Sequence, residues 1–214
     1  MTVLLVLLTF LVFIALDWAL GRQPAVATAS VPDDAPVDGF EVPAGLRYHQ
    51  GHSWLVPERR QLVRVGMDEF AATLAGGLEK LELPRPGQWI RQGQRSWSLF
   101  RSGEKVEMVS PVEGEVLEIN PEVIANPALM REDPYGRGWL MTVHVPDEEG
   151  MMRNLVPVNL VRQWMRDAVE RLYAAQPQFA GATAADGGRP VGDIWKGLPN
   201  AQWKKTASDF FLTA

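Results

Sequence analysis

The chain has 214 residues, a formal net charge of −5 and no cysteine. The acidic balance argues against a protein that binds nucleic acid electrostatically, because such proteins gather lysine and arginine into a basic surface. The absence of cysteine excludes disulfides and thiol nucleophiles, and the three histidines lack the spacing of a metal site. Without a nucleophile elbow or a phosphate-binding loop, the sequence predicts a protein that is not an enzyme and holds no metal.

The first segment, residues 1–22, contains an apolar run from Val3 to Leu20 whose only charged residue is Asp17. As a helix this run would span ~27 Å, about the thickness of a hydrocarbon core. No basic residue precedes it, so we expect an uncleaved transmembrane anchor; a signal peptide cleaved within residues 25–29 is the alternative. Arg22 follows the run, and the positive-inside rule therefore predicts a single-pass protein of the inner membrane with its remaining domain in the cytoplasm.

Residues 23–46 are rich in proline, alanine, valine and aspartate, a composition typical of an extended tether. The next segment, residues 47–150, has the pattern of a β-rich domain. Polar and apolar residues alternate in two stretches, and a third stretch is a further strand candidate; the three are 61–65, 114–119 and 139–145. Asp68 is placed to cap a short helix that ends near Leu74. Turn residues at short intervals favour a small barrel or sandwich.

Several motifs occur in order along this domain. They are Gly51-His52-Ser53-Trp54, Val65-Gly66-Met67-Asp68-Glu69-Phe70-Ala71, Glu82-Leu83-Pro84, Ser110-Pro111-Val112-Glu113-Gly114-Glu115-Val116 and Glu132-Asp133-Pro134-Tyr135-Gly136-Arg137-Gly138-Trp139-Leu140. On these motifs, residues 48–147 resemble the H protein of the glycine cleavage system, which carries a lipoyl group on a hairpin lysine. The resemblance implies a mainly β fold, a lipoyl-type barrel-sandwich hybrid of two sheets with short flanking helices. In that resemblance His52 has a structural role.

The lipoylation signature of that family reads Glu-Ser-Val-Lys-Ala, and the aligned residues here are Phe100-Arg101-Ser102-Gly103-Glu104. Gly103 thus occupies the position of the lipoyl lysine, and we expect the hairpin to turn at Ser102-Gly103 because glycine accepts a positive φ. Lys105 lies two positions later, ~6.6 Å along the strand. We favour a solvated Lys105 paired with neighbouring acids, and hence no cofactor; a lipoyl group on Lys105 is the alternative.

The remaining residues add two C-terminal parts. Residues 151–175 place apolar side chains three and four apart, which predicts an amphipathic helix packed on the barrel, with a membrane-surface helix as the alternative. Residues 176–214 combine a flexible linker with an aromatic tail that we expect to dock on a protein, its own domain or a partner. Core packing is the default for Trp89 and Trp97, with an interaction surface as the alternative. The residues predicted to bind a partner are Trp97, Phe100, Trp195, Trp203, Phe210 and Phe211.

Together these features predict a non-catalytic structural subunit of a larger membrane complex, with energy conversion, respiratory or photosynthetic, as the expected setting. Its partners would be integral membrane subunits and, through residues 3–20, the lipid bilayer, with no nucleic acid. One alternative is a membrane-tethered lipoyl carrier that uses Lys105 in one-carbon, acyl or aminomethyl transfer. Another is a periplasmic or cell-surface binding module.

Overall fold

The structure, a computed structural model, describes residues 35–175 and 199–214. The chain divides into two units, Met1–Asp33 and Asp34–Ala214, and every described residue belongs to the second. The predicted anchor, residues 1–22, therefore lies outside the described residues. Among the helices of the described ranges, none has both the length and the apolar character that a membrane crossing requires.

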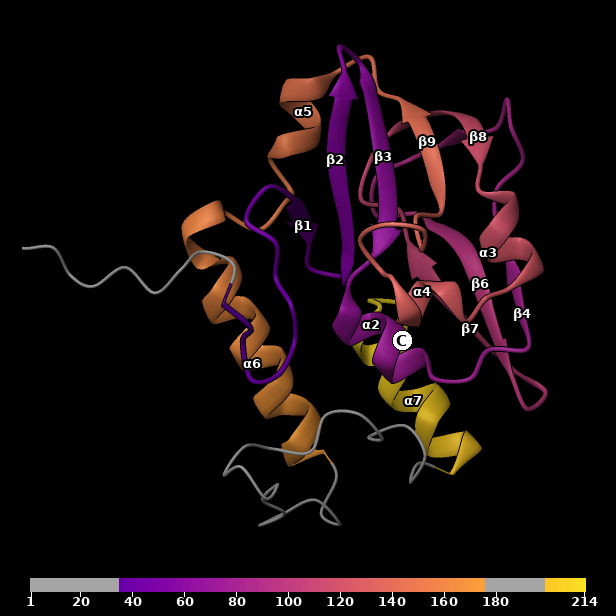
Figure 1. The fold of residues 1–214 in the computed structure, drawn as a ribbon, viewed down its shortest axis with the longest axis vertical. Helices are drawn as coiled ribbons and strands as arrows, with labels where there is room; N and C mark the ends of the chain where they lie inside the picture. The colour runs from indigo at the N-terminus through magenta and orange to yellow at the C-terminus, as the bar shows by residue number, and fades with distance from the viewer. Residues whose placement is uncertain (1–34, 176–198) are drawn as a thin grey trace, which may run out of the picture. The chain divides into compact units, whose positions relative to one another are not determined.

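The larger of two antiparallel sheets has six strands in the order β1-β2-β3-β9-β8-β5. Their bounds are β1 Arg47–His49, β2 Ser53–Arg59, β3 Leu62–Met67, β5 Trp89–Ile90, β8 Gly114–Ile119 and β9 Met141–His144. The three stretches expected to be strands correspond to β3, β8 and β9. Figure 1 shows β2, β3, β9 and β8 side by side. In the sheet order β5 follows β8 at the edge.

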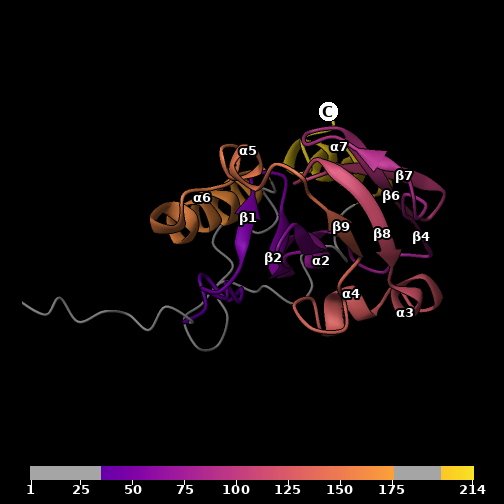
Figure 2. The same cartoon turned by 90° about the horizontal axis from the view of Figure 1, so that it is seen from above.

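The smaller sheet has the order β4-β6-β7, with β4 at Lys80–Glu82, β6 at Arg95–Arg101 and β7 at Glu104–Val109. Figure 2 shows it beside the larger sheet, with β8 next to β6 and β7 in the view. Both sheets contribute to one buried core, which includes Val65 and Val143 from the larger sheet and Leu99 and Val106 from the smaller. The predicted two-sheet, mainly β fold is thereby confirmed.

Short helices flank the sheets. They are α2 Glu69–Ala75, α3 Pro121–Ala125, α4 Leu129–Glu132, α5 Glu148–Met152, a 3-10 turn at Val158–Leu160 and α6 Val161–Ala174. Asp68 caps α2 as predicted, since its Oδ1 accepts a hydrogen bond from the Ala71 amide at 2.7 Å. The predicted amphipathic helix is α6, whose buried side chains recur at three and four residues.

Residues 37–42 belong to the core, which corrects the expectation of a free tether for this part of residues 23–46. Val37, Phe40 and Val42 are buried, and the Phe40 ring lies 5.4 Å from that of Phe70 on α2. The Tyr135 hydroxyl donates to the Glu41 carbonyl at 2.6 Å and accepts from the Glu69 amide at 3.1 Å. Because its backbone is hydrogen-bonded to the domain, this segment is held in place.

The C-terminal residues form a helix, α7 Asn200–Phe210, that packs against α2 and β7 (Figure 1). Its buried face includes Trp203 and Ala207, and Phe210 lies with its ring 5.1 Å from Phe70. The aromatic tail therefore docks on the chain's own domain. Trp195 and the predicted linker, residues 176–198, lie outside the described residues.

Candidate functional site

The candidate site is the hairpin formed by β6 and β7. Arg101 and Glu104 are the last paired residues, and Ser102 and Gly103 between them have φ values of 49° and 79°. Two central residues with positive φ are the signature of a type I′ turn, so the predicted hairpin and its turn are confirmed. A Cβ atom at Gly103 would meet nothing within 4 Å, so the tip itself is open.

One face of this hairpin, which we call the outer face, carries Lys105. Phe100 pairs with Lys105 on one side and with Lys80 on the other, so the three side chains form a row across β4, β6 and β7. The Lys80 ammonium lies 5.2 Å from the centre of the Phe100 ring. Phe100 is half-buried in this row, between two lysine side chains.

The Lys105 ammonium is exposed and ion-paired. Its Nζ lies 2.9 Å from Glu107 Oε1, and 47% of its side-chain surface is accessible. The hydrogen bond from Lys105 holds the pKa of the Glu107 carboxyl below its ordinary value. A lipoyl group joins protein through an amide to a lysine nitrogen, so access to that nitrogen is the first requirement for attachment. Lys105 meets it, although on the strand and two residues past the position given by the family signature.

The opposite face, the inner face, is covered by α7. The Arg101 guanidinium lies 5.1 Å from the centre of the Trp203 ring, and Lys204 Nζ lies 2.9 Å from Glu104 Oε2. Trp203 is fully buried, and its indole nitrogen donates to the Leu74 carbonyl at 2.9 Å. α7 thus holds the turn end of the hairpin through contacts with its inner face.

The last residues continue this contact along β7. The Thr213 hydroxyl donates to the Glu107 carbonyl at 3.0 Å, and Arg95 Nη2 donates to the Thr213 carbonyl at 2.7 Å. Phe210 and Phe211 are buried together with Trp203.

The residues predicted to bind a partner are therefore placed differently from one another. Trp97 is buried in the core, and Trp203, Phe210 and Phe211 contact the chain's own domain, so none of these four is exposed for a partner in this arrangement. Phe100 alone of the described ones reaches the surface. A role in partner binding stays a prediction for the set.

A buried hydrogen bond joins His52 to Asp68, the residue that caps α2. His52 Nδ1 and Asp68 Oδ2 are 2.8 Å apart, and neither side chain is exposed. The His52 ring stacks on Phe70 at 4.3 Å and on Trp164 at 4.6 Å. With aromatic rings on both sides and no access to solvent, this pair supports the structural role that the sequence assigns to His52.

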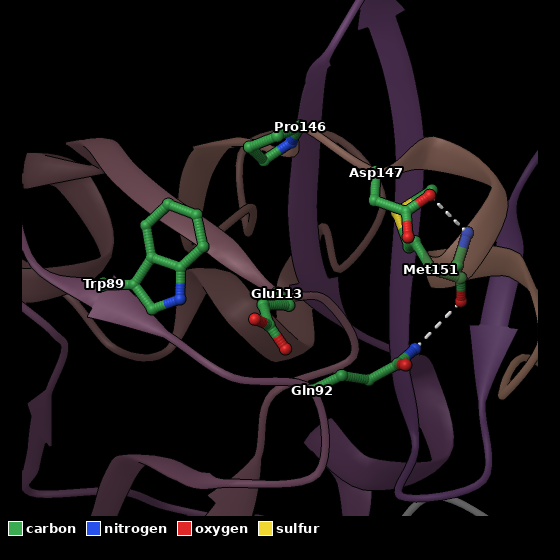
Figure 3. A pocket seen from close by; sticks show the side chains of 7 residues that line it. Trp89, Gln92, Glu113, Pro146, Asp147 and Met151 are labelled. Carbon is green, nitrogen blue, oxygen red and sulfur yellow. Dashed lines mark hydrogen bonds between the residues drawn. The ribbon is translucent and has the colours of Figure 1, made fainter.

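Sequence reasoning missed a second concave region, a pocket between β5, the loop before β8, and α5 (Figure 3). Trp89 lies at its edge with 49% of its surface exposed, which corrects the default expectation that Trp89 packs in the core. The residues that form this pocket are far apart in sequence, and Trp89 was the only signal that could have pointed to it.

Comparison with known proteins gives a consistent family. The family model described as "Glycine cleavage H-protein" matches residues 46–168. The "Glycine cleavage system H protein" of Thermobifida fusca is 36% identical over 109 residues, covering 51% of this chain and 86% of the relative. That of Mycobacterium leprae is 33% identical over 107 residues, covering 50% and 81%. A crystal structure of the glycine cleavage system H protein from Mycobacterium marinum superposes with a TM-score of 0.51 at 24% identity, covering 59% of this chain and 98% of that chain, which supports the fold.

These relatives overturn two predictions. A structural subunit of a membrane complex is wrong as the main function, because the matching proteins are glycine cleavage system H proteins. The predicted inner-membrane location is corrected by the same relatives, and no helix of the described ranges could cross a membrane. The prediction that no nucleic acid is bound stays a prediction.

Proposed function

Because the chain belongs to the glycine cleavage H-protein family, we propose that it is a lipoyl carrier whose attachment residue is Lys105. Members of this family are not enzymes, and neither is this chain. The observation that carries the proposal is the exposed Lys105 ammonium on the outer face of the same hairpin that the family signature identifies. When bound, the lipoyl group supplies a disulfide that accepts and releases the transferred group.

The residues around Lys105 hold its nitrogen at a defined place. Lys105 pairs with Phe100 across the strands, and Glu107 accepts a hydrogen bond from Nζ. Pairing within a sheet fixes the Cα position and direction of the side chain more tightly than a loop would. Glu107 also competes with attachment, because amide formation removes the charge that this carboxylate contacts. The hairpin therefore presents the lysine from a rigid strand.

The covered inner face limits how other proteins can approach. α7 and residues 211–214 contact β7 along the inner face and its backbone, through the bonds to Glu104 and Glu107. An enzyme that attaches the lipoyl group or uses it must therefore reach Lys105 from the outer face or from the tip. Phe100 and Lys80 lie in that path and form the immediate surroundings of the attachment site.

Lipoylation measured by mass spectrometry tests the proposal. The full chain is incubated with a lipoate-attaching ligase, lipoate and ATP, and the H protein of Mycobacterium leprae serves as the positive control. We expect one lipoyl adduct, located on the peptide that contains Lys105. Lys105→Arg should abolish the adduct, whereas Lys80→Arg and Lys204→Arg, which alter lysines of the same sheet and of α7, should retain it. An unmodified chain beside a fully modified control would exclude the carrier function.

A further inference from the structure

We propose that the pocket beside Trp89 binds a small organic cation, an alkylammonium or guanidinium group. Its cavity is about 290 Å³ and is lined by Trp89, Gln92, Glu113, Pro146, Asp147, Gly150 and Met151 (Figure 3). A cavity of this size is at the lower end of the range for small-ligand sites. It goes beyond the carrier function and does not depend on it.

The pocket is formed before any ligand arrives, because Gln92 links its walls. The Gln92 side-chain amide donates to the Pro111 carbonyl at 2.8 Å and to the Met151 carbonyl at 2.9 Å. Its Oε1 accepts from Asn154 Nδ2 at 2.8 Å. Both amide N–H donors of Gln92 are engaged in these bonds, so its side chain is held in place between the walls of the pocket.

The charge of the lining selects a cation. Glu113 and Asp147 contribute two carboxylates, and no lysine, arginine or histidine is among the lining residues. Within the described part of the chain, Glu113 has no hydrogen bond or ion pair. Asp147 uses Oδ1 to accept from the Gly150 amide at 2.8 Å, where it caps α5. A Cβ at Gly150 would lie 2.2 Å from Asp147 Oδ2, so glycine keeps the space beside this second oxygen open.

Trp89 contributes an aromatic face to the pocket. Figure 3 shows its indole and Asp147 on opposite sides of the view with Glu113 between them. Tryptophan is the aromatic residue that attracts cations most strongly. An indole opposite carboxylates favours a group that is both positively charged and apolar at its surface, as alkylammonium and guanidinium groups are. A neutral molecule would lack the attraction to the carboxylates, and an anion would be repelled by them.

The pocket is separate from the attachment site. It lies at the Arg95 end of β6, next to the loop that holds Gln92, whereas the turn follows Arg101 at the other end. Six residue rises at ~3.3 Å place these two ends roughly 20 Å apart. Loss of ligand binding here and loss of lipoylation at Lys105 can therefore be measured independently.

The test is an NMR titration of the full, ¹⁵N-labelled chain with choline and with 3,3-dimethyl-1-butanol, its neutral analogue of the same shape. We expect choline to shift the Trp89 indole and Gly150 amide resonances saturably, with a Kd in the millimolar range on the order expected for so small a ligand. The neutral alcohol should shift them at least about threefold less at equal concentration. Equal shifts by both compounds, or shifts that do not saturate, would overturn the proposal.

Substitutions in the lining test whether choline binds in this pocket. Glu113→Gln, Asp147→Asn and Trp89→Leu should each weaken binding of choline by about three- to tenfold. For Trp89→Leu, which removes the indole resonance, binding is followed at the Gly150 amide. Asparagine also caps helices, so Asp147→Asn removes charge without removing the cap. The matched control is Glu115→Gln, because Glu115 pairs with Trp89 across the strands but lies outside the pocket. An equal loss with Glu115→Gln would reduce the effect to general surface charge and contradict the site.

A second cation distinguishes the source of the ligand. N-acetyl-arginine methylamide presents a guanidinium on a protein-like stem. Tighter binding of this compound than of choline would assign the pocket to a basic side chain of another protein, and the reverse order to a free quaternary ammonium compound. Both results support a cation site. Failure of both compounds to bind would overturn it.

Discussion

The two faces of the β6–β7 hairpin are built from the same stretch of sequence, residues 95–109, and yet they are used in opposite ways. The inner face places Arg101 and Glu104 against α7, where Trp203 is fully buried. The outer face leaves Lys105 exposed, with Glu107 as its partner. Because side chains of a strand alternate between faces, one hairpin can be anchored on one side and remain chemically accessible on the other. Stability and carrier chemistry should therefore respond to different substitutions.

The largest expected effect is on the anchored side. Trp203→Ala removes a fully buried indole and its bond to the Leu74 carbonyl, so we expect a loss of about 3–5 kcal/mol in the free energy of unfolding. Phe100→Ala on the outer face is the matched variant and should cost clearly less, since Phe100 is half-buried. Urea unfolding followed by circular dichroism measures both. Equal losses would erase the distinction between the faces.

Acid should lower the free energy of unfolding of the domain through His49. Burial, with repulsion from His52 as the smaller cause, lowers the pKa of His49 from 6.5 to about 4. Between these values the unfolded chain binds a proton that the folded chain does not, so stability falls as pH is lowered through this window, by up to about 3 kcal/mol. His49 Nδ1 accepts a hydrogen bond from the Gly51 amide at 3.1 Å.

Unfolding at pH 7 and at pH 4.5 checks this dependence. His49→Asn keeps an acceptor for the Gly51 amide but cannot be protonated, so its stability should change less between the two pH values than that of the unmodified chain. The difference between the two chains isolates His49 from the acidic residues, which titrate in both. Parallel pH curves for the two chains would show that His49 does not contribute.

The turn joins the two faces, and Gly103→Lys tests it. Lysine at a φ of 79° costs about 1–2 kcal/mol, while the open surroundings add no steric conflict. In a Lys105→Arg background, we expect the lysine at position 103 to restore lipoylation, since it stands where the family signature has its lysine. Gly103→Ala reports the backbone cost alone. A stable but unmodified Gly103→Lys chain would show that the neighbouring residues, and not only the lysine, determine recognition.

The smallest effect is expected for the ion pair between α7 and the turn. Lys204 and Glu104 have accessible side-chain fractions of 52% and 33%, and such exposed pairs contribute little because water and salt screen them. Lys204→Ala should cost about 0.5 kcal/mol or less. A double-mutant cycle with Glu104→Ala, repeated in 1 M salt, measures the coupling. A coupling above about 2 kcal/mol would mean that charge, and not the burial of Trp203, holds α7.

The features that sequence predicts well are local. The turn at Ser102-Gly103, the cap at Asp68 and the buried stripe of α6 each depend on residues within one or two turns of the chain. The features that it missed join distant residues. Trp203 donates to Leu74 across 129 positions, and Gln92 joins the loop of Pro111 to α5. Such contacts depend on the shape of the assembled core, which periodicity and spacing do not encode.

Composition was misleading at both ends of the domain. Proline and aspartate in residues 23–46 indicated a tether, but Phe40 and its apolar neighbours outweigh them because their burial is favourable once α2 is present. The aromatic tail was expected to bind a partner, whereas Trp203, Phe210 and Phe211 are buried in the chain's own domain. Composition does not distinguish these two docking surfaces. The same ambiguity led to the membrane-complex function that the family relationship overturns.

The position of Phe70 has a consequence for how this protein can be shortened. Its ring contacts Phe40 at 5.4 Å and Phe210 at 5.1 Å, and both neighbours lie outside residues 46–168, the segment that family comparison delimits. A fragment cut at those limits would present one aromatic ring to water on two sides. The boundary of the family and the boundary of the folding unit are therefore different in this chain. A shortened chain should begin no later than residue 35 and should keep α7.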